Sequence, residues 1–117
     1  MRKLITLVAF VVGIAAATAR GEVTILKEWI GKTQAEVTKT YRDKPFHEVK
    51  YPATKAPGEL RNKVSEAYPA KDPASAKVEI HEVWWAEGDF RTTFLLHLKG
   101  GKWVVLDAIR WHKDTVF

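Results

Sequence analysis

Cysteine is absent from the chain, which has 117 residues. Its absence excludes a disulfide framework, a thiolate metal site, a cysteine nucleophile and a lipid-modified cysteine at a mature N-terminus. Serine is also scarce: Ser65 and Ser75 are the only two, and neither lies in a nucleophile-elbow pattern such as G-x-S-x-G. No glycine-rich phosphate loop is present. The sequence therefore predicts a protein that is not an enzyme and that binds no cofactor.

A strong excess of one charge is missing too. The chain has 19 Lys and Arg against 14 Asp and Glu, a net charge of +5. Basic and acidic residues alternate, as in Lys27-Glu28 and Lys71-Asp72. Such alternation is typical of a solvated surface, whereas nucleic-acid binders gather their basic residues on one face. We expect no nucleic-acid partner.

The longest apolar run lies at the N-terminus. Arg2 and Lys3 precede the apolar stretch 4–17, and Ala17-Thr18-Ala19 supplies small residues after it. This order is typical of a cleaved signal peptide, and the run is shorter than the roughly 20 residues of a membrane-spanning helix. We expect cleavage after Ala19, so that residues 20–117 form one small exported domain. It would be soluble, periplasmic or secreted, and would not span a membrane.

Two helices are expected at the start of this domain. The spacing of Leu26, Trp29 and Ile30 predicts a short helix over residues 23–30, and Gly31 ends it. The run Thr33-Gln34-Ala35-Glu36 then fits a capping box, which predicts a second helix over about 33–42. Its buried stripe would consist of Val37 and Tyr41.

All five prolines of the chain lie between residues 44 and 76. This density argues against continuous regular structure there. One proline-free stretch, 59–68, has Leu60, Val64 and Ala67 at helical spacing and predicts a short third helix. The alternative is a partly ordered loop.

The last 41 residues predict three strands, over 77–85, 90–99 and 102–112, with turns at 87–89 and 100–101. The expected fold is therefore α+β, with two or three short helices packed on one side of a three-stranded antiparallel meander in two layers.

The register of this meander decides which side chains share a face. A two-residue turn at Gly100-Gly101 pairs Leu98 with Trp103. A three-residue turn at 87–89 would place Ile80 and Trp84 on the same face as Phe94. A two-residue turn would shift the first strand by one residue and show its other face. We prefer the first register, because it gathers the apolar residues: Val78, Ile80 and Trp84 join the face on which the Gly100-Gly101 turn already places Phe94 with Trp103, Val105 and Ile109.

Trp84 and Trp85 are consecutive, so their rings point to opposite faces of a strand. The second face would then carry an apolar patch that is a candidate partner-binding surface. The alternative is that the proline-rich segment 44–76 folds over this patch and makes it a second core. The patch consists of Val83, Trp85, Leu95, Val104 and Leu106.

Several polar residues of the strands could carry chemistry. His81, His97 and His112 come from three neighbouring strands, but they do not converge on one point, so we predict no metal site. Asp107 falls on the apolar face opposite Phe94, where an unpaired carboxylate is costly, and it should have a partner.

The residues Gly31, Thr33, Val37 and Tyr41 follow a pattern that resembles the opening of the small exported SmpA/OmlA (BamE-like) domains. The family's usual glycine before the following proline is replaced here by the run Arg42-Asp43-Lys44-Pro45. The resemblance implies a two-layer fold and a non-enzymatic binding module of the cell envelope. Without the lipoprotein cysteine, this chain would be a soluble relative.

Two functions follow from the sequence. The first is an exported protein-binding or envelope-assembly module with a protein partner in the cell envelope. The alternative is a cystatin-like or nuclear transport factor 2-like domain, in which a curved sheet encloses a tryptophan-lined pocket for a small ligand or for hydrolysis. His81, Asp107 and Arg110 would be its polar groups. The oligomeric state is not predicted.

Overall fold

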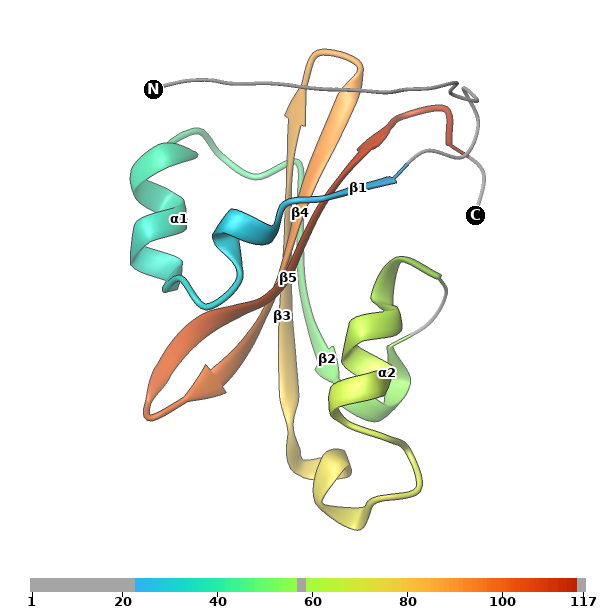
Figure 1. The fold of residues 1–117 in the computed structure, drawn as a ribbon. Helices are drawn as coiled ribbons and strands as arrows, with labels where there is room; N and C mark the ends of the chain where they lie inside the picture. Colours follow the sequence, from blue (N-terminus) through green and yellow to red (C-terminus); the bar gives the residue numbers. More distant parts are fainter. Residues whose placement is uncertain (1–22, 57–58, 116–117) are drawn as a thin grey trace.

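The fold is built on one antiparallel sheet of five strands, in the spatial order β1-β5-β4-β3-β2. The computed structural model describes residues 23–56 and 59–115, so the expected signal peptide lies outside the described residues. The expected three-stranded meander is wrong: its strands are present as β3 to β5, but a further strand lies on each side of them (Figure 1). The strands are β1 Val23–Ile25, β2 His47–Pro52, β3 Glu79–Glu87, β4 Phe90–Lys99 and β5 Lys102–His112.

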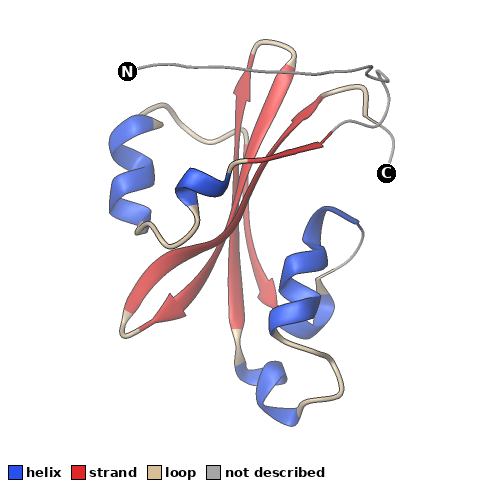
Figure 2. Cartoon of the chain, viewed as in Figure 1, coloured by secondary structure: helices blue, strands red, loops and turns tan. Residues whose placement is uncertain are grey.

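The helices lie on both sides of the sheet, so the expected two-layer arrangement is also wrong. Helix α1 (Gln34–Thr40) covers one face and helix α2 (Asn62–Ala67) covers the other, with the strands between them (Figures 1 and 2). Most other helical segments are single 3₁₀ turns. These segments are η2 Lys27–Trp29, η3 Ala53–Lys55, η4 Glu59–Arg61 and η5 Pro73–Lys77.

The helix expected over residues 23–30 is replaced by strand β1 and the 3₁₀ turn η2. Val23, Thr24 and Ile25 are all β-branched, which favours an extended backbone. Strand β1 pairs with the residues from Trp111 back to Ile109 of β5. Tertiary pairing at the edge of the sheet therefore outweighs the helical spacing of the apolar residues.

Strand β2 lies within the proline-rich segment, where no strand was expected. It pairs antiparallel with β3 at the other edge of the sheet. Pro52 is its last residue, and an edge strand tolerates proline because one row of its backbone groups needs no partner. The prolines therefore limit the length of this strand without preventing it.

The two hairpins set which residues share a face. Gly100 and Gly101 both have positive φ values, 56° and 79°, as a two-residue turn requires, and the predicted pairing of Leu98 with Trp103 is confirmed. The other turn also has two residues, because Glu87 pairs directly with Phe90. The preferred three-residue turn at 87–89 is therefore wrong, and β3 takes the shifted register.

A β-bulge in β5 moves part of that strand to the opposite face. Leu96 pairs with Val105 but Leu95 pairs with Asp107, so Leu106 is an extra residue. A bulge of one residue reverses the direction of every side chain beyond it. Ile109, which was expected beside Phe94, therefore faces the α2 side.

The core on the α1 side is aromatic. Phe94, Trp85 and Val83 are buried there with Val37 of α1, and the rings of Trp29 and Tyr41 pack against Phe94. The capping box that begins α1 is confirmed, since Thr33 and Glu36 bond reciprocally to each other's backbone N–H. The capping box thus fixes where α1 begins, and from that start Val37 and Tyr41 reach the core on this side of the sheet.

The segment that follows β2 builds a second core on the α2 side. Val64 of α2 and Ala53 of η3 are buried against Ile80 and Leu95 of the sheet. Leu60 forms a further cluster with Ile109 and Trp111. The proline-rich segment therefore covers the second face instead of leaving it exposed.

The carboxylate of Glu82 lies at the centre of this second layer and is fully buried. Arg61 donates to both of its oxygens, from Nε and Nη2 at 2.7 Å each. Tyr51 Oη donates to Oε1 at 2.7 Å and Trp84 Nε1 donates to Oε2 at 2.8 Å, while His47 Nε2 lies 3.3 Å from Oε2. One side chain of β3 therefore joins η4, β2 and its own strand.

The hydrogen bonds decide the charge of this group. Burial alone would raise the pKa of Glu82, but the hydrogen bonds from Arg61 and Tyr51 outweigh it and lower the pKa below its usual value. A bidentate arginine is the donor best matched to a carboxylate. The ionised form is thus the native form, and its contribution to stability is lost only when the pH falls below about 4.

We expect the substitution Arg61→Met to lower the free energy of unfolding by about 3–5 kcal/mol, because it leaves the Glu82 charge buried without its main partner. Urea unfolding followed by circular dichroism measures the effect. The matched control is Lys63→Met, which removes an exposed ion pair with Glu66 and should cost less than about 1 kcal/mol. Equal losses from the two variants would contradict this account of the second layer.

Candidate functional site

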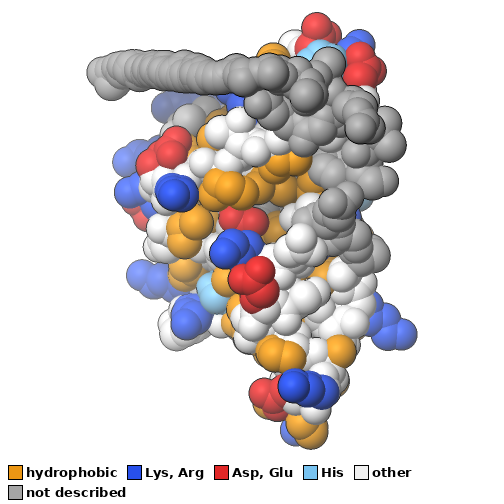
Figure 3. Space-filling view, turned by 45° about the vertical axis from the view of Figure 1, so that its right-hand side comes forward, with side chains coloured by type: hydrophobic (Ala, Val, Ile, Leu, Met, Phe, Trp, Pro, Cys, Tyr) orange, Lys and Arg blue, Asp and Glu red, His pale blue; other side chains and the backbone are white. Residues whose placement is uncertain are grey.

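The five residues of the predicted partner-binding patch are divided between the two faces of the sheet. Val83 and Trp85 are buried under α1, and Leu95 is buried under the α2 side, where Leu106 packs beside it. Val104 pairs with His97 and is half-buried. In the view that brings the α2 side forward, apolar side chains surface as separate groups with charged ones between them (Figure 3). The five residues therefore form no common exposed surface.

The polar groups of the alternative pocket are not brought together either. His81 lies on the α1 face, where its ring centroid is 5.6 Å from that of Trp103. Asp107 lies on the opposite face and pairs with Leu95, so its expected place opposite Phe94 is wrong. Arg110 lies near the other end of the sheet, with its guanidinium 4.7 Å from the ring centroid of Phe90.

The three histidines of the strands each have a separate partner. His81 Nε2 lies 2.7 Å from Glu48 Oε2, and His97 Nδ1 lies 2.6 Å from the hydroxyl of Tyr68. His112 packs its ring edge-on against Phe90. Their separate environments give them structural roles in the sheet.

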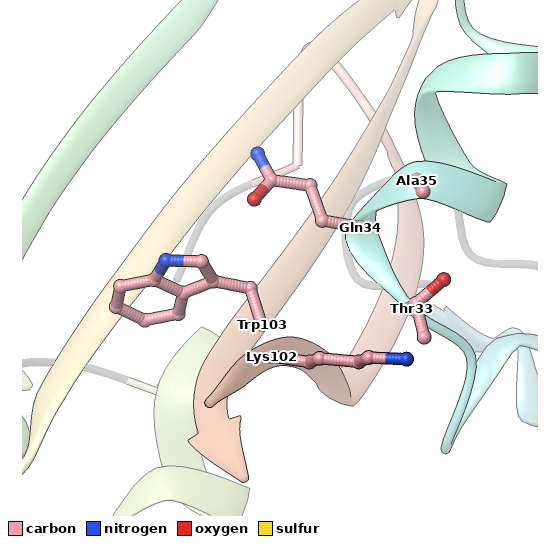
Figure 4. Close-up of a pocket in the computed structure, with 5 residues that line it drawn as sticks. All are labelled: Thr33, Gln34, Ala35, Lys102 and Trp103. Carbon is pink, nitrogen blue, oxygen red and sulfur yellow. The ribbon is translucent and has the colours of Figure 1, made fainter. Parts of the chain in front are cut away.

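A shallow pocket of about 320 Å³ lies where the start of β5 meets the start of α1. Gln34 extends from α1 toward Trp103 on β5, and Lys102 runs along the opening toward Thr33 (Figure 4). We call this site the Trp103 pocket. Its lining residues are Thr33, Gln34, Ala35, Lys102 and Trp103.

Local structure explains why Trp103 is left partly open. It is the second residue of β5, directly after the Gly100-Gly101 turn, and it pairs with Leu98, which is 55% exposed. Residues 31–33 cover the edge of β5 next to it, through hydrogen bonds between Gly31 N and Val105 O and between Val105 N and Lys32 O. The covering chain turns into α1 at that point, so the edge beside Trp103 stays open.

Two hydrogen-bond donors at this pocket have no partner among the described residues. The indole N–H of Trp84, Trp85 and Trp111 all donate within the protein. The indole N–H of Trp103 and the amide of Gln34 bond to no residue that the structure describes. Donors at a pocket wall are the groups that fix the orientation of a ligand.

The sequence pointed to Trp103 only as a core residue. Its signal was its place next to a glycine turn, because the first residues of a strand lie at the end of the sheet and are less covered than its middle. Gln34 was noticed only as part of the capping box, and Lys102 only as a strand end.

Comparison with known proteins adds no assignment, since the chain matches no protein-family model, no curated protein and no solved structure. The resemblance to the SmpA/OmlA domains therefore stays a prediction. Over the ranges 23–56 and 59–115, no helix is long and apolar enough to cross a membrane.

Asp107 has an unusual environment for a carboxylate. It is 3% exposed, and its Oδ1 accepts a hydrogen bond from the N–H of Ala108 at 3.0 Å. Burial raises its pKa, although the Ala108 N–H and Lys63 of α2 partly oppose this and Glu66 adds to it. A raised native pKa stabilises the fold at acidic pH, and this contribution is lost as the pH rises through that pKa.

We therefore expect Asp107→Asn to become more stable relative to the natural protein as the pH rises from 3 toward 7, with the difference levelling off above the native pKa. Urea unfolding of both proteins at several pH values measures it. The contribution of Glu82 has the opposite pH dependence and cancels in the difference. If the difference in the free energy of unfolding between the two proteins did not change with pH, the raised pKa of the buried Asp107 would be contradicted.

Proposed function

We propose that this protein is an exported, non-enzymatic binding module that holds a segment of a partner protein at the Trp103 pocket. The observation that carries the proposal is the pocket itself, in which a half-buried tryptophan faces an open hollow beside the exposed Leu98. Tryptophans in such places commonly supply much of the binding energy of protein interfaces. The resemblance to envelope modules of the SmpA/OmlA type agrees with this function.

The acidic groups near the pocket support binding over catalysis. Glu36 is committed to the capping box of α1, and Glu48 is bonded to His81. A catalytic acid or base would have to reach a reacting atom in the pocket. Neither carboxylate is free to do so without breaking a bond that holds a helix end or a strand in place.

One observation favours the small-ligand alternative. The volume of about 320 Å³ lies at the lower limit of about 300 Å³ for small-molecule pockets. Such a ligand would contact Gln34, Lys102 and Trp103, because Asp107 and Arg110 lie elsewhere. We place this function second, because the pocket is shallow and adjoins the exposed Leu98.

Export is part of the proposal and rests on the N-terminal pattern of basic, apolar and small residues up to Ala19. The protein would then meet its partner in the periplasm or outside the cell.

We expect Trp103→Ala to abolish recovery of the partner when the tagged protein is used for affinity capture from an envelope extract, because the aromatic wall of the pocket is lost. The matched control is Phe46→Ala. It removes an aromatic ring that is 60% exposed and that packs against the guanidinium of Arg91, away from the pocket. This control should capture the partner as well as the natural protein does.

Thermal unfolding of both variants separates binding from folding. Trp103→Ala should unfold cooperatively, because its ring packs on the rim of the core and not within it. The proposal would be refuted if Phe46→Ala lost the partner as completely as Trp103→Ala does. It would also be refuted if Trp103→Ala still captured the partner. Loss of a small molecule from Trp103→Ala, with no protein recovered by either variant, would favour the small-ligand alternative.

A further inference from the structure

The charges around the Trp103 pocket identify the kind of partner. Two ammonium groups lie at its two ends: Lys50 Nζ lies 5.5 Å from the centroid of the Trp103 ring, and Lys102 lines the pocket with its ammonium directed away from the indole toward Thr33 (Figure 4). Neither lysine forms an ion pair with any residue in the described part of the chain. The pocket therefore has one positive charge at its Trp103 end and one at its Thr33 end, and neither forms an ion pair within the described protein.

The nearby carboxylates do not supply this neutralisation. Glu36 Oε1 accepts from both the backbone N–H and the hydroxyl of Thr33, at 2.9 and 3.1 Å. Glu48 Oε2 lies 2.7 Å from Nε2 of the buried His81. Both acids are held by partners of their own, and neither forms an ion pair with Lys50 or Lys102.

The hairpin end beside the pocket carries a further positive charge, although Lys99 points to the face of the sheet opposite Trp103. Lys99 and Lys102 are directly opposite each other across β4 and β5, a placement in which like charges repel and destabilise a sheet. Gly100 and Gly101 form the turn between them, and no acidic residue lies in the turn. The end of the sheet that holds the pocket therefore has a positive character.

The uncharged groups of the pocket also suit an acceptor. The Trp103 indole N–H and the Gln34 amide are donors without a described partner, as noted above, and Gln34 extends over the pocket toward Trp103 (Figure 4). Leu98, directly opposite Trp103, offers an exposed apolar surface next to these donors. Charge, donors and apolar surface thus lie side by side.

We infer that the Trp103 pocket binds an acidic segment of a polypeptide, in which an aspartate or glutamate carboxylate meets the lysine and indole donors and a neighbouring apolar side chain covers Trp103 and Leu98. This inference rests on the proposed function and specifies its partner. A polypeptide suits the site better than a free anion, because the apolar surface of Leu98 continues beyond the pocket.

Two synthetic peptides test the inference. One alternates glutamate with phenylalanine, and the other has glutamine in place of every glutamate. Isothermal titration calorimetry with the whole protein should show tighter binding of the glutamate peptide, and the advantage should shrink as salt is added, because surface charges are screened within about 10 Å at 0.1 M salt. Equal binding of the two peptides would overturn the inference.

Lysine variants locate the charge. Lys50→Gln and Lys102→Gln should each weaken the glutamate peptide about two- to fivefold and leave the glutamine peptide unchanged, and Lys102→Glu should weaken the glutamate peptide further. The matched control is Lys55→Gln, an exposed lysine of η3 on the other side of the sheet, which should change neither. If Lys55→Gln weakened binding of the glutamate peptide as much as Lys102→Gln does, the binding would depend on the net charge of the protein and not on this site.

The result for Trp103→Ala separates this inference from the proposed function. One result is that Trp103→Ala binds neither peptide while the lysine variants bind both as the natural protein does. This result would support the pocket as a binding site but overturn its preference for acidic segments. Binding of both peptides that survives Trp103→Ala would overturn the pocket itself. A short DNA oligonucleotide that binds as tightly as the glutamate peptide would overturn the assignment to a polypeptide.

Discussion

The buried carboxylate of Glu82 is the constraint on which the second half of the structure depends. A charge in a closed interior is stable only with strong partners, and its partners Arg61, Tyr51 and Trp84 come from different parts of the chain. Satisfying Glu82 therefore holds η4 and β2 against β3, and α2 follows η4 directly. The proline-rich segment consists of short elements joined by loops, and this one group ties two of them, β2 and η4, to the sheet.

How much of the fold follows from the sequence depends on the range of each interaction. Helix α1 and the turn at Gly100-Gly101 were predicted correctly, because a capping box and paired glycines act over a few residues. Strands β1 and β2 were missed, since both exist only through pairing with distant strands, and the bulge at Leu106 has no local signal. The position of Glu82 does carry a signal: on its face of the strand it lies between Ile80 and Trp84, and a carboxylate buried between apolar side chains requires a cationic partner elsewhere in the chain.

The predicted patch failed for a related reason. Its five residues were grouped on one register, and both the two-residue turn after Glu87 and the bulge in β5 change which side chains share a face. The Trp103 pocket depends on a different feature, the place where residues 31–33 leave the edge of β5 to begin α1. The chain covers both faces of the sheet but leaves this end open, so the indole N–H of Trp103 and the amide of Gln34 face the pocket. The lysines at this end give it a positive character suited to an acidic partner.

The most direct test of this account uses the indole N–H signals of the five tryptophans in an NMR spectrum of isotope-labelled protein, with Trp103 assigned by the Trp103→Phe variant. The glutamate–phenylalanine peptide is added during the measurement. The account predicts that the Trp103 signal shifts, while the signals of Trp84, Trp85 and Trp111, whose N–H groups donate within the protein, stay in place. An unchanged Trp103 signal, or a shift confined to the other four tryptophans, would contradict the Trp103 pocket as the binding site.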